Sequence, residues 1–187
     1  IISGFVLSVA AALLLAVLSN ASRTASFLIE PIVKVIRATP VASIVILALV
    51  WISSRNLSVI ISFMMVFPIV YSNVLEGIRN TDGKLLEAAD IYRVRRVKRI
   101  RYIYLPSVIP YFSASVKAAL GLAWKSGIAA EVISLPDGSI GERVYEAKIY
   151  LSTPDLFAWT LVIIVLAFLF ERFFLLLTAA LSRRIEG

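Results

Sequence analysis

Hydrophobic residues occur along this chain in long runs, and charged residues collect between the runs. The apolar runs cover roughly residues 1–20, 41–53, 57–74, 107–133 and 156–181. A helix of about 20 apolar residues is long enough to cross the hydrocarbon core of a bilayer. The pattern therefore predicts an all-α integral membrane protein with about five transmembrane helices.

The second run is the weakest of the five, because it is short for a bilayer unless its helix begins earlier. The preceding segment, residues 21–39, has an apolar stripe at helical spacing. Three cations and one anion interrupt that stripe: Arg23, Lys34, Arg37 and Glu30. We expect an amphipathic helix here, on the same side of the membrane as the other basic loops.

Composition supports a membrane protein and disfavours a soluble enzyme. Hydrophobic residues make up 60% of the 187 residues, and the mean hydropathy is +0.91. Soluble domains are usually about half apolar. The chain contains neither Cys nor His, so disulfides, thiolate metal sites and histidine acid–base chemistry are excluded. We expect no catalytic residue, no metal site and no cofactor in this chain.

The net charge of +7 is distributed unevenly between the loops. Residues 21–39 carry a net +2, and residues 76–102 carry +4 from eight cations and four anions; the tail from residue 182 carries +1. On the other side, Arg55 gives +1 and residues 134–155 give −2. Lys and Arg are retained on the cytoplasmic side. The alternation predicts five crossings, starting outside and ending inside.

The most informative loop lies between the third and fourth runs and reads LLEAADIYRVRRVKRIRYIYLP, residues 85–106. It contains Glu87, Ala88 and Ala89, then three residues, Arg93, nine residues, and finally Ile103, Leu105 and Pro106. This spacing resembles the EAA loop of ABC importer permeases, which reads EAA, three residues, Gly, nine residues, I-x-L-P. Every fixed element is present except the glycine, which is Arg93.

The resemblance implies a role for the loop. In that family it forms a short coupling helix that sits in a groove of a cytoplasmic ATPase subunit. The residues of this chain that correspond to the motif, and to which the resemblance assigns the coupling role, are Glu87, Ala88, Ala89, Arg93, Leu105 and Pro106. We expect Glu87 near the start of this helix, where exposed amides favour a carboxylate, and Pro106 in the first turn of the next span. Because glycine provides a positive φ at the position of Arg93, we expect the chain to turn there with ordinary dihedral angles, or to turn nearby.

Further stretches are similar to the nitrate, sulfonate and taurine class of these permeases. They are Val35 to Ala42, which looks like the R-x-x-P-x-x-A stretch of that class, Gly121 to Trp124 followed by Ala130 and Glu131, and Gly138 to Gly141. Members of the class commonly have one more N-terminal helix. We therefore expect residues 1–187 to be a single transmembrane permease domain that lacks an upstream helix. The resemblance leaves open whether the solute is nitrate, a sulfonate, taurine, bicarbonate or a vitamin precursor.

The basic run from Arg93 to Arg101 allows three interpretations. Nucleic-acid binding would require a soluble domain or aromatic platforms, and the run is instead enclosed by two spans, so we expect no nucleic acid. Contact with anionic membrane lipid is compatible with the position of the run. Docking of the ATPase subunit is the more specific interpretation, and the two can hold together.

Ionisable residues within the spans are candidates for the translocation pathway, because a charge in lipid is costly. In the fourth run Lys117, Trp124 and Glu131 follow helical steps with Gly121 and Ile128 and should share a face. Lys125 lies off that stripe, near mid-span, and should face a cavity or a buried partner. The alternative is that these long side chains extend to the membrane surface. The candidates are Lys117, Trp124, Lys125 and Glu131.

Taken with the resemblance, these features predict a permease subunit of an ATP-driven importer that works by alternating access. The chain has no G-x-x-x-x-G-K-[ST] loop, so ATP and Mg²⁺ should bind a separate ATP-binding cassette subunit. The other implied partners are a second permease subunit, expected to be an identical copy, and an extracytoplasmic solute-binding protein. The implied location is the cytoplasmic membrane of a prokaryote. The alternatives are an ABC permease for amino acids or other solutes, and a passive channel or membrane scaffold.

Overall fold

The computed structural model describes residues 1–186, with side chains up to residue 176. This part of the chain is helical and contains no strand, which confirms the all-α prediction. The helices are α1 (Ile2–Ala21), α2 (Arg23–Ala38), α3 (Val41–Ala48), α4 (Ser54–Arg79), α5 (Gly83–Ile91), α6 (Arg96–Arg99), the π-helical turn η1 (Ile100–Tyr104), α7 (Leu105–Ser134), α8 (Ile140–Ile149) and α9 (Thr153–Glu186).

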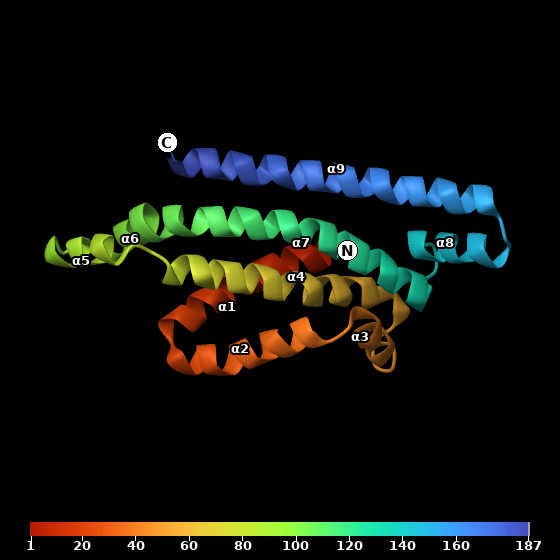
Figure 1. Cartoon of the computed structure of the whole chain (residues 1–187), viewed down its shortest axis with the longest axis horizontal. Helices are drawn as coiled ribbons and strands as arrows, with labels where there is room; N and C mark the ends of the chain where they lie inside the picture. The colour runs from red at the N-terminus through yellow and green to blue at the C-terminus, as the bar shows by residue number, and fades with distance from the viewer. Residues whose placement is uncertain (187) are drawn as a thin grey trace.

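The long helices run lengthwise beside one another (Figure 1). The most extensive contacts join α4 to α7 and α1 to α4, and α9 packs against α7 and α8. The short helices α5 and α6 lie at one end of the bundle, and α3 and α8 lie at the other (Figure 1). The predicted loop of residues 85–106 therefore projects from one end of the molecule.

Small residues let the central helices approach closely. A Cβ added to Gly4 of α1 would lie 2.2 Å from the carbonyl oxygen of Val59 in α4. Ala12, Ala16, Ala119 and Ala123 are fully buried in the same core. Because lipid is as apolar as the helix surface, association in a membrane depends on close packing of this kind.

Three side-chain hydrogen bonds connect helices inside this core. Tyr71 on α4 and Ser19 on α1 pair through their hydroxyls at 2.8 Å. Ser8 donates to the carbonyl of Phe63 at 3.2 Å, and Ser62 donates to the carbonyl of Ala123 at 3.2 Å. Each bond satisfies a polar group that would otherwise face an apolar environment, so the bonds also fix how the helices align.

Three described helices are long and apolar enough to cross a membrane: α1, α4 and α9. They correspond to the first, third and fifth predicted runs. The fourth run forms α7, whose 30 residues are long enough, but Lys117, Lys125 and Glu131 make it less apolar than the other three. Up to four spans result if α2 and α3 are counted as one bent span.

The second run, residues 41–53, does not form a straight helix of spanning length. Only Val41–Ala48 is helical there, about 12 Å of helix at 1.5 Å per residue, and its axis is bent by 103° from that of α2. The break falls at Thr39 and Pro40, because a proline disfavours helical geometry at the residue before it. Helix α2 instead runs back along the bundle from the α5 end toward α3 (Figure 1). The charges of residues 21–39 are therefore spread along the bundle and do not lie in one loop.

Candidate functional site

The predicted coupling loop contains a nine-residue helix, α5, which lies beyond the end of α4 (Figure 1). Its N-cap is Asp82, whose carboxylate accepts a hydrogen bond of 2.9 Å from the amide of Lys84. A short polar side chain at this position satisfies amides that have no partner within the helix. The helix thus begins with Asp82, before the EAA sequence.

Glu87 is consequently the fifth residue of α5, in the middle of the helix and not near its start. Its side chain is exposed, and no hydrogen bond or ion pair joins it to another described residue. Ala88 is half-buried, and Ala89 is buried with 4% of its surface exposed. The helix therefore presents Glu87 outward and sets Ala89 against the rest of the loop.

The backbone at Arg93 does not have the ordinary dihedral angles that the sequence led us to expect. Its φ is +50°, so it occupies the left-handed region that the family's glycine would favour. Its amide donates to the carbonyl of Asp90 at 3.1 Å, and the amide of Val94 donates to the carbonyl of Ala89 at 2.9 Å. These two bonds form the Schellman arrangement that ends a helix. The chain turns sharply here, and the arginine adopts the strained dihedral angle.

Replacing Arg93 with glycine should stabilise the loop. A Cβ in the left-handed region costs about 1–2 kcal/mol, and glycine's greater freedom in the unfolded chain offsets about half of that gain. We expect the amides of α5 to exchange several-fold more slowly in Arg93→Gly, as measured by hydrogen exchange in detergent.

Arg95 supplies the control for this measurement, because its φ is −59° and its side chain is also exposed. Arg95→Gly relieves no strain and should not slow exchange. Equal effects of the two substitutions would show that the positive φ of Arg93 carries no strain.

Arg99 holds the end of α5 in place. Its Nε donates to the carbonyl of Val94 at 2.9 Å, and its Nη2 donates to the carbonyl of Ala89 at 3.0 Å. Its Nη1 pairs with the carboxylate of Asp90. A planar guanidinium can serve three acceptors at once, and a cation is favourable at a helix C-terminus. One side chain from α6 thus fixes the orientation of α5.

Sequence reasoning did not single out Arg99 from the other cations of the loop. The structure shows that Arg93, Arg95, Arg96, Lys98 and Arg101 are exposed and that Arg99 is half-buried. The nine-residue separation between Asp90 and Arg99 corresponds to no local spacing rule. Their pairing results from the reversal of the chain at Arg93, so only the folded loop shows it.

The I-x-L-P end of the loop anchors it to the bundle. Leu105 begins α7 and its amide donates to the carbonyl of Ile100, which closes the π-helical turn η1. Pro106 lies in the first turn of α7, as predicted, where a missing amide hydrogen costs little. Ile103 and Leu105 are half-buried. Leu105 also lines an apolar pocket of about 380 Å³ between α1, α4 and the start of α7.

The predicted pathway residues of α7 do not share one face. The exposed positions follow helical steps and form a stripe of small residues and two lysines: Ala114, Lys117, Ala118, Gly121, Lys125 and Ala129. Lys125 thus lies on the same face as Lys117 and Gly121, whereas Ile128 is buried. The exposed face is rotated from the predicted stripe because α9 packs over the Trp124 side of α7.

Trp124 and Glu131 have packing contacts. The indole of Trp124 lies 5.7 Å from the ring of Phe170 on α9, and its Nε1 is buried without a hydrogen-bond partner in the described part of the chain. Glu131 accepts a hydrogen bond of 3.3 Å from the amide of Gly141, in the first turn of α8. A Cβ on Gly141 would lie 2.4 Å from that of Glu131. Glu131 therefore braces α8 against the end of α7.

Comparison with known proteins identifies the class. Residues 4–187 match the family described as binding-protein-dependent transport system inner membrane component, and the chain belongs to this family. The resemblance to ABC importer permeases of the nitrate, sulfonate and taurine class is thereby confirmed.

Several curated permeases are similar to the chain. The putative aliphatic sulfonates transport permease protein SsuC of Bacillus subtilis is 27% identical over 96% of this chain. The taurine transport system permease protein TauC of Escherichia coli is 26% identical over 80% of it, and the nitrate import permease protein NrtB of Synechococcus elongatus is 29% identical over 64%. The chain spans 65%, 54% and 43% of the lengths of these three relatives.

Proposed function

We propose that this chain is the membrane-spanning subunit of an ATP-driven importer for a small solute of the nitrate, sulfonate and taurine group. The observation that carries the proposal is the coupling loop. A short helix projects from one end of the bundle, and Arg99 holds its C-terminus through three contacts. A short helix held in a fixed orientation can transmit movement of a docked ATPase to the membrane-spanning helices.

The docking surface consists of exposed charges on both parts of the loop. Glu87 on α5 and the exposed cations of α6 are unpaired among the described residues and can form charge-assisted bonds with a partner. The partner is an ATP-binding cassette subunit that holds ATP and Mg²⁺ in the cytoplasm. A solute-binding protein delivers the solute at the opposite end, near α3 and α8.

The exposed face of α7 supports pairing with a second permease subunit, another copy of this chain. Lys117 and Lys125 would be costly in lipid, whereas a water-filled path or a partner subunit lowers that cost. Ala114, Ala118 and Gly121 on the same face permit close approach of another helix. We infer that this face lines a water-filled interface with the second subunit, with Lys117 and Lys125 beside it. Trp124 and Glu131 hold α7 in position.

Reconstitution tests the proposal. The permease should co-purify with an ATP-binding subunit when both are co-expressed. In inside-out vesicles, ATP added to the medium and solute-loaded binding protein trapped in the lumen should drive solute outward into the medium. Flux that runs down the solute gradient without ATP, with no ATPase retained on purification, would identify a passive channel and overturn the proposal.

A further inference from the structure

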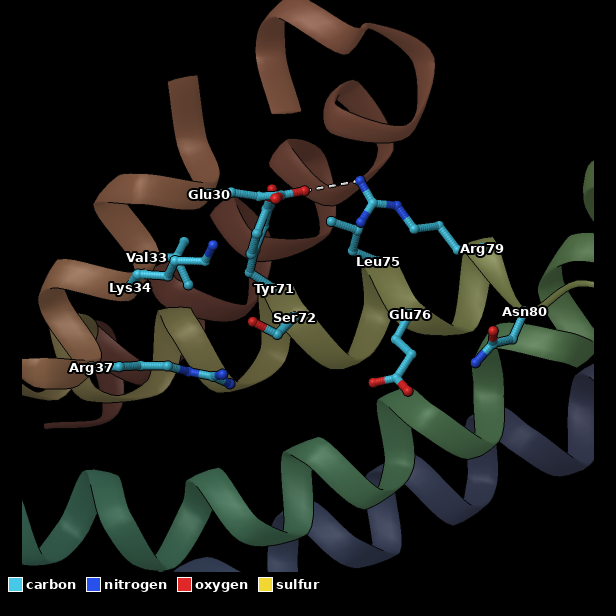
Figure 2. Close-up of a pocket in the computed structure, with 10 residues that line it drawn as sticks. All are labelled: Glu30, Val33, Lys34, Arg37, Tyr71, Ser72, Leu75, Glu76, Arg79 and Asn80. Atoms are coloured by element: carbon cyan, nitrogen blue, oxygen red, sulfur yellow. Dashed lines mark hydrogen bonds and ion pairs between the residues drawn. The ribbon is translucent and has the colours of Figure 1, made fainter. Parts of the chain in front are cut away.

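A groove with charged residues in its lining runs between α2 and α4 (Figure 2). It encloses about 360 Å³, within the range of small-molecule sites. Its charged lining residues are Glu30, Lys34, Arg37, Glu76 and Arg79, with Tyr71, Ser72 and Asn80 between them. Such a concentration of charge beside a membrane span requires an explanation.

The charged residues of α2 share one face. Glu30, Lys34 and Arg37 follow steps of four and three residues, so they lie above one another along the helix. Glu30 pairs with Arg79 at 2.9 Å, which closes the groove near the end of α4. At the other end, Nη2 of Arg37 donates to the carbonyl of Pro68 at 3.2 Å. The charged face of α2 is therefore turned toward α4.

Pro68 places Arg37 well inside the span. It is the fifteenth of the 26 residues of α4, so roughly 16 to 21 Å of helix separates it from either end. A guanidinium at this depth cannot reach the membrane surface by the short route open to cations near helix ends. A stable arginine at this position needs a water-filled groove or an anionic partner.

The groove keeps an excess of positive charge. Glu30 and Arg79 neutralise each other, whereas Lys34 has no hydrogen-bond or ion-pair partner among the residues that the structure describes. Arg37 uses one of its five donors within the chain. Glu76, the remaining acid, points away from Lys34 toward α7 (Figure 2). Lys34 and Arg37 are thus available to an anion that enters the groove.

We propose that Arg37 and Lys34 bind the oxyanion head of the transported solute, a sulfonate or nitrate, on its way through the membrane. This inference rests on the function proposed above and names the residues that recognise the solute. A guanidinium presents a planar pair of donors that matches two oxygens of such a group, and an ammonium adds a point charge. Phospholipid headgroups carry similar oxygens, but they lie at the membrane surface, away from Pro68.

The test uses the complete transporter in proteoliposomes, with labelled taurine and labelled nitrate as probes and the binding protein at saturation. Arg37→Gln removes the charge and the planar pair of donors and should lower the uptake rate at least tenfold. Lys34→Gln removes a charge that has no described structural partner and should lower it about threefold or more. Co-purification of the ATP-binding subunit should be unchanged, because neither residue lies in the coupling loop.

Arg23→Gln is the matched control, since Arg23 is an exposed cation of the same helix outside this groove, and it should leave uptake within twofold. Normal uptake by both groove variants, or a wild-type transporter that accepts only uncharged solutes, would overturn the inference while leaving the proposed function intact. A defect that disappears when anionic lipids are replaced by phosphatidylcholine would assign the groove to a headgroup. Absence of ATP-driven uptake of any solute by the wild type would overturn the proposed function itself.

Discussion

Arg99→Met should abolish the stimulation of ATP hydrolysis by the solute-loaded binding protein while the permease remains folded in the membrane. The substitution keeps most of the side chain's apolar stem and removes contacts to Ala89, Val94 and Asp90. Hydrogen bonds from a charged donor contribute about 1.5–3 kcal/mol each. The loss is large compared with the stability of a nine-residue helix, which is marginal by itself.

ATPase assays on the reconstituted complex measure this effect, with Arg101→Met as the control. Arg101 is an exposed cation of the same loop, and its removal should reduce stimulation less than twofold. Arg99→Lys should recover only part of the activity, because a single ammonium cannot reach three acceptors in the geometry of a guanidinium. Full coupling in Arg99→Met would show that α5 is held by other contacts.

Glu87→Lys should reduce coupled ATP hydrolysis at least tenfold. The side chain is exposed in the middle of α5 and makes no hydrogen bond or ion pair within residues 1–176, so reversing its charge should have little effect on the fold. On a docking surface the same reversal replaces an attraction by a repulsion, which costs several kcal/mol when the pair is desolvated. Co-purification of the ATP-binding subunit should weaken in parallel.

Glu146→Lys provides a comparison on α8, at the opposite end of the bundle. Glu146 pairs with Arg143 at 2.9 Å on the surface, and an exposed pair of this kind contributes at most about 1 kcal/mol. Its reversal should leave co-purification of the ATP-binding subunit unchanged, because α8 lies at the opposite end of the bundle from α5 (Figure 1). Equal losses in the two variants would indicate a general effect of surface charge and would count against a docking role for Glu87.

Arg93 and Arg99 together show how this loop turns sharply with an arginine at the position of the motif's glycine. Arg93 takes the left-handed conformation, which costs about 1–2 kcal/mol for a residue with a Cβ. The Schellman bonds at the end of α5 and the three contacts made by Arg99 from α6 both stabilise this turn. We infer that the contacts of Arg99 offset the strain at Arg93, so Arg93→Gly should partly restore coupling to Arg99→Met.

The hydrophobic runs determined the all-α fold and the positions of α1, α4, α7 and α9. In lipid a spanning segment must satisfy its backbone hydrogen bonds internally. A single long apolar run can do so only by forming a helix. The motif spacing similarly located the helix α5 and placed Pro106 in the first turn of α7. These features depend on residues that are neighbours in the sequence, and for that reason they could be predicted.

Only the tertiary structure decided which charged residues act together. The path of α2 along α4, the pairing of Asp90 with Arg99 and the exposed face of α7 each depend on residues far apart in the sequence. A count of loop charges treats Arg37 and Arg99 as two cations of the same kind, although one lies opposite the middle of a span and the other caps a helix. The environment of a charge is set by the helices packed around it, and the order of residues along one helix does not specify that packing.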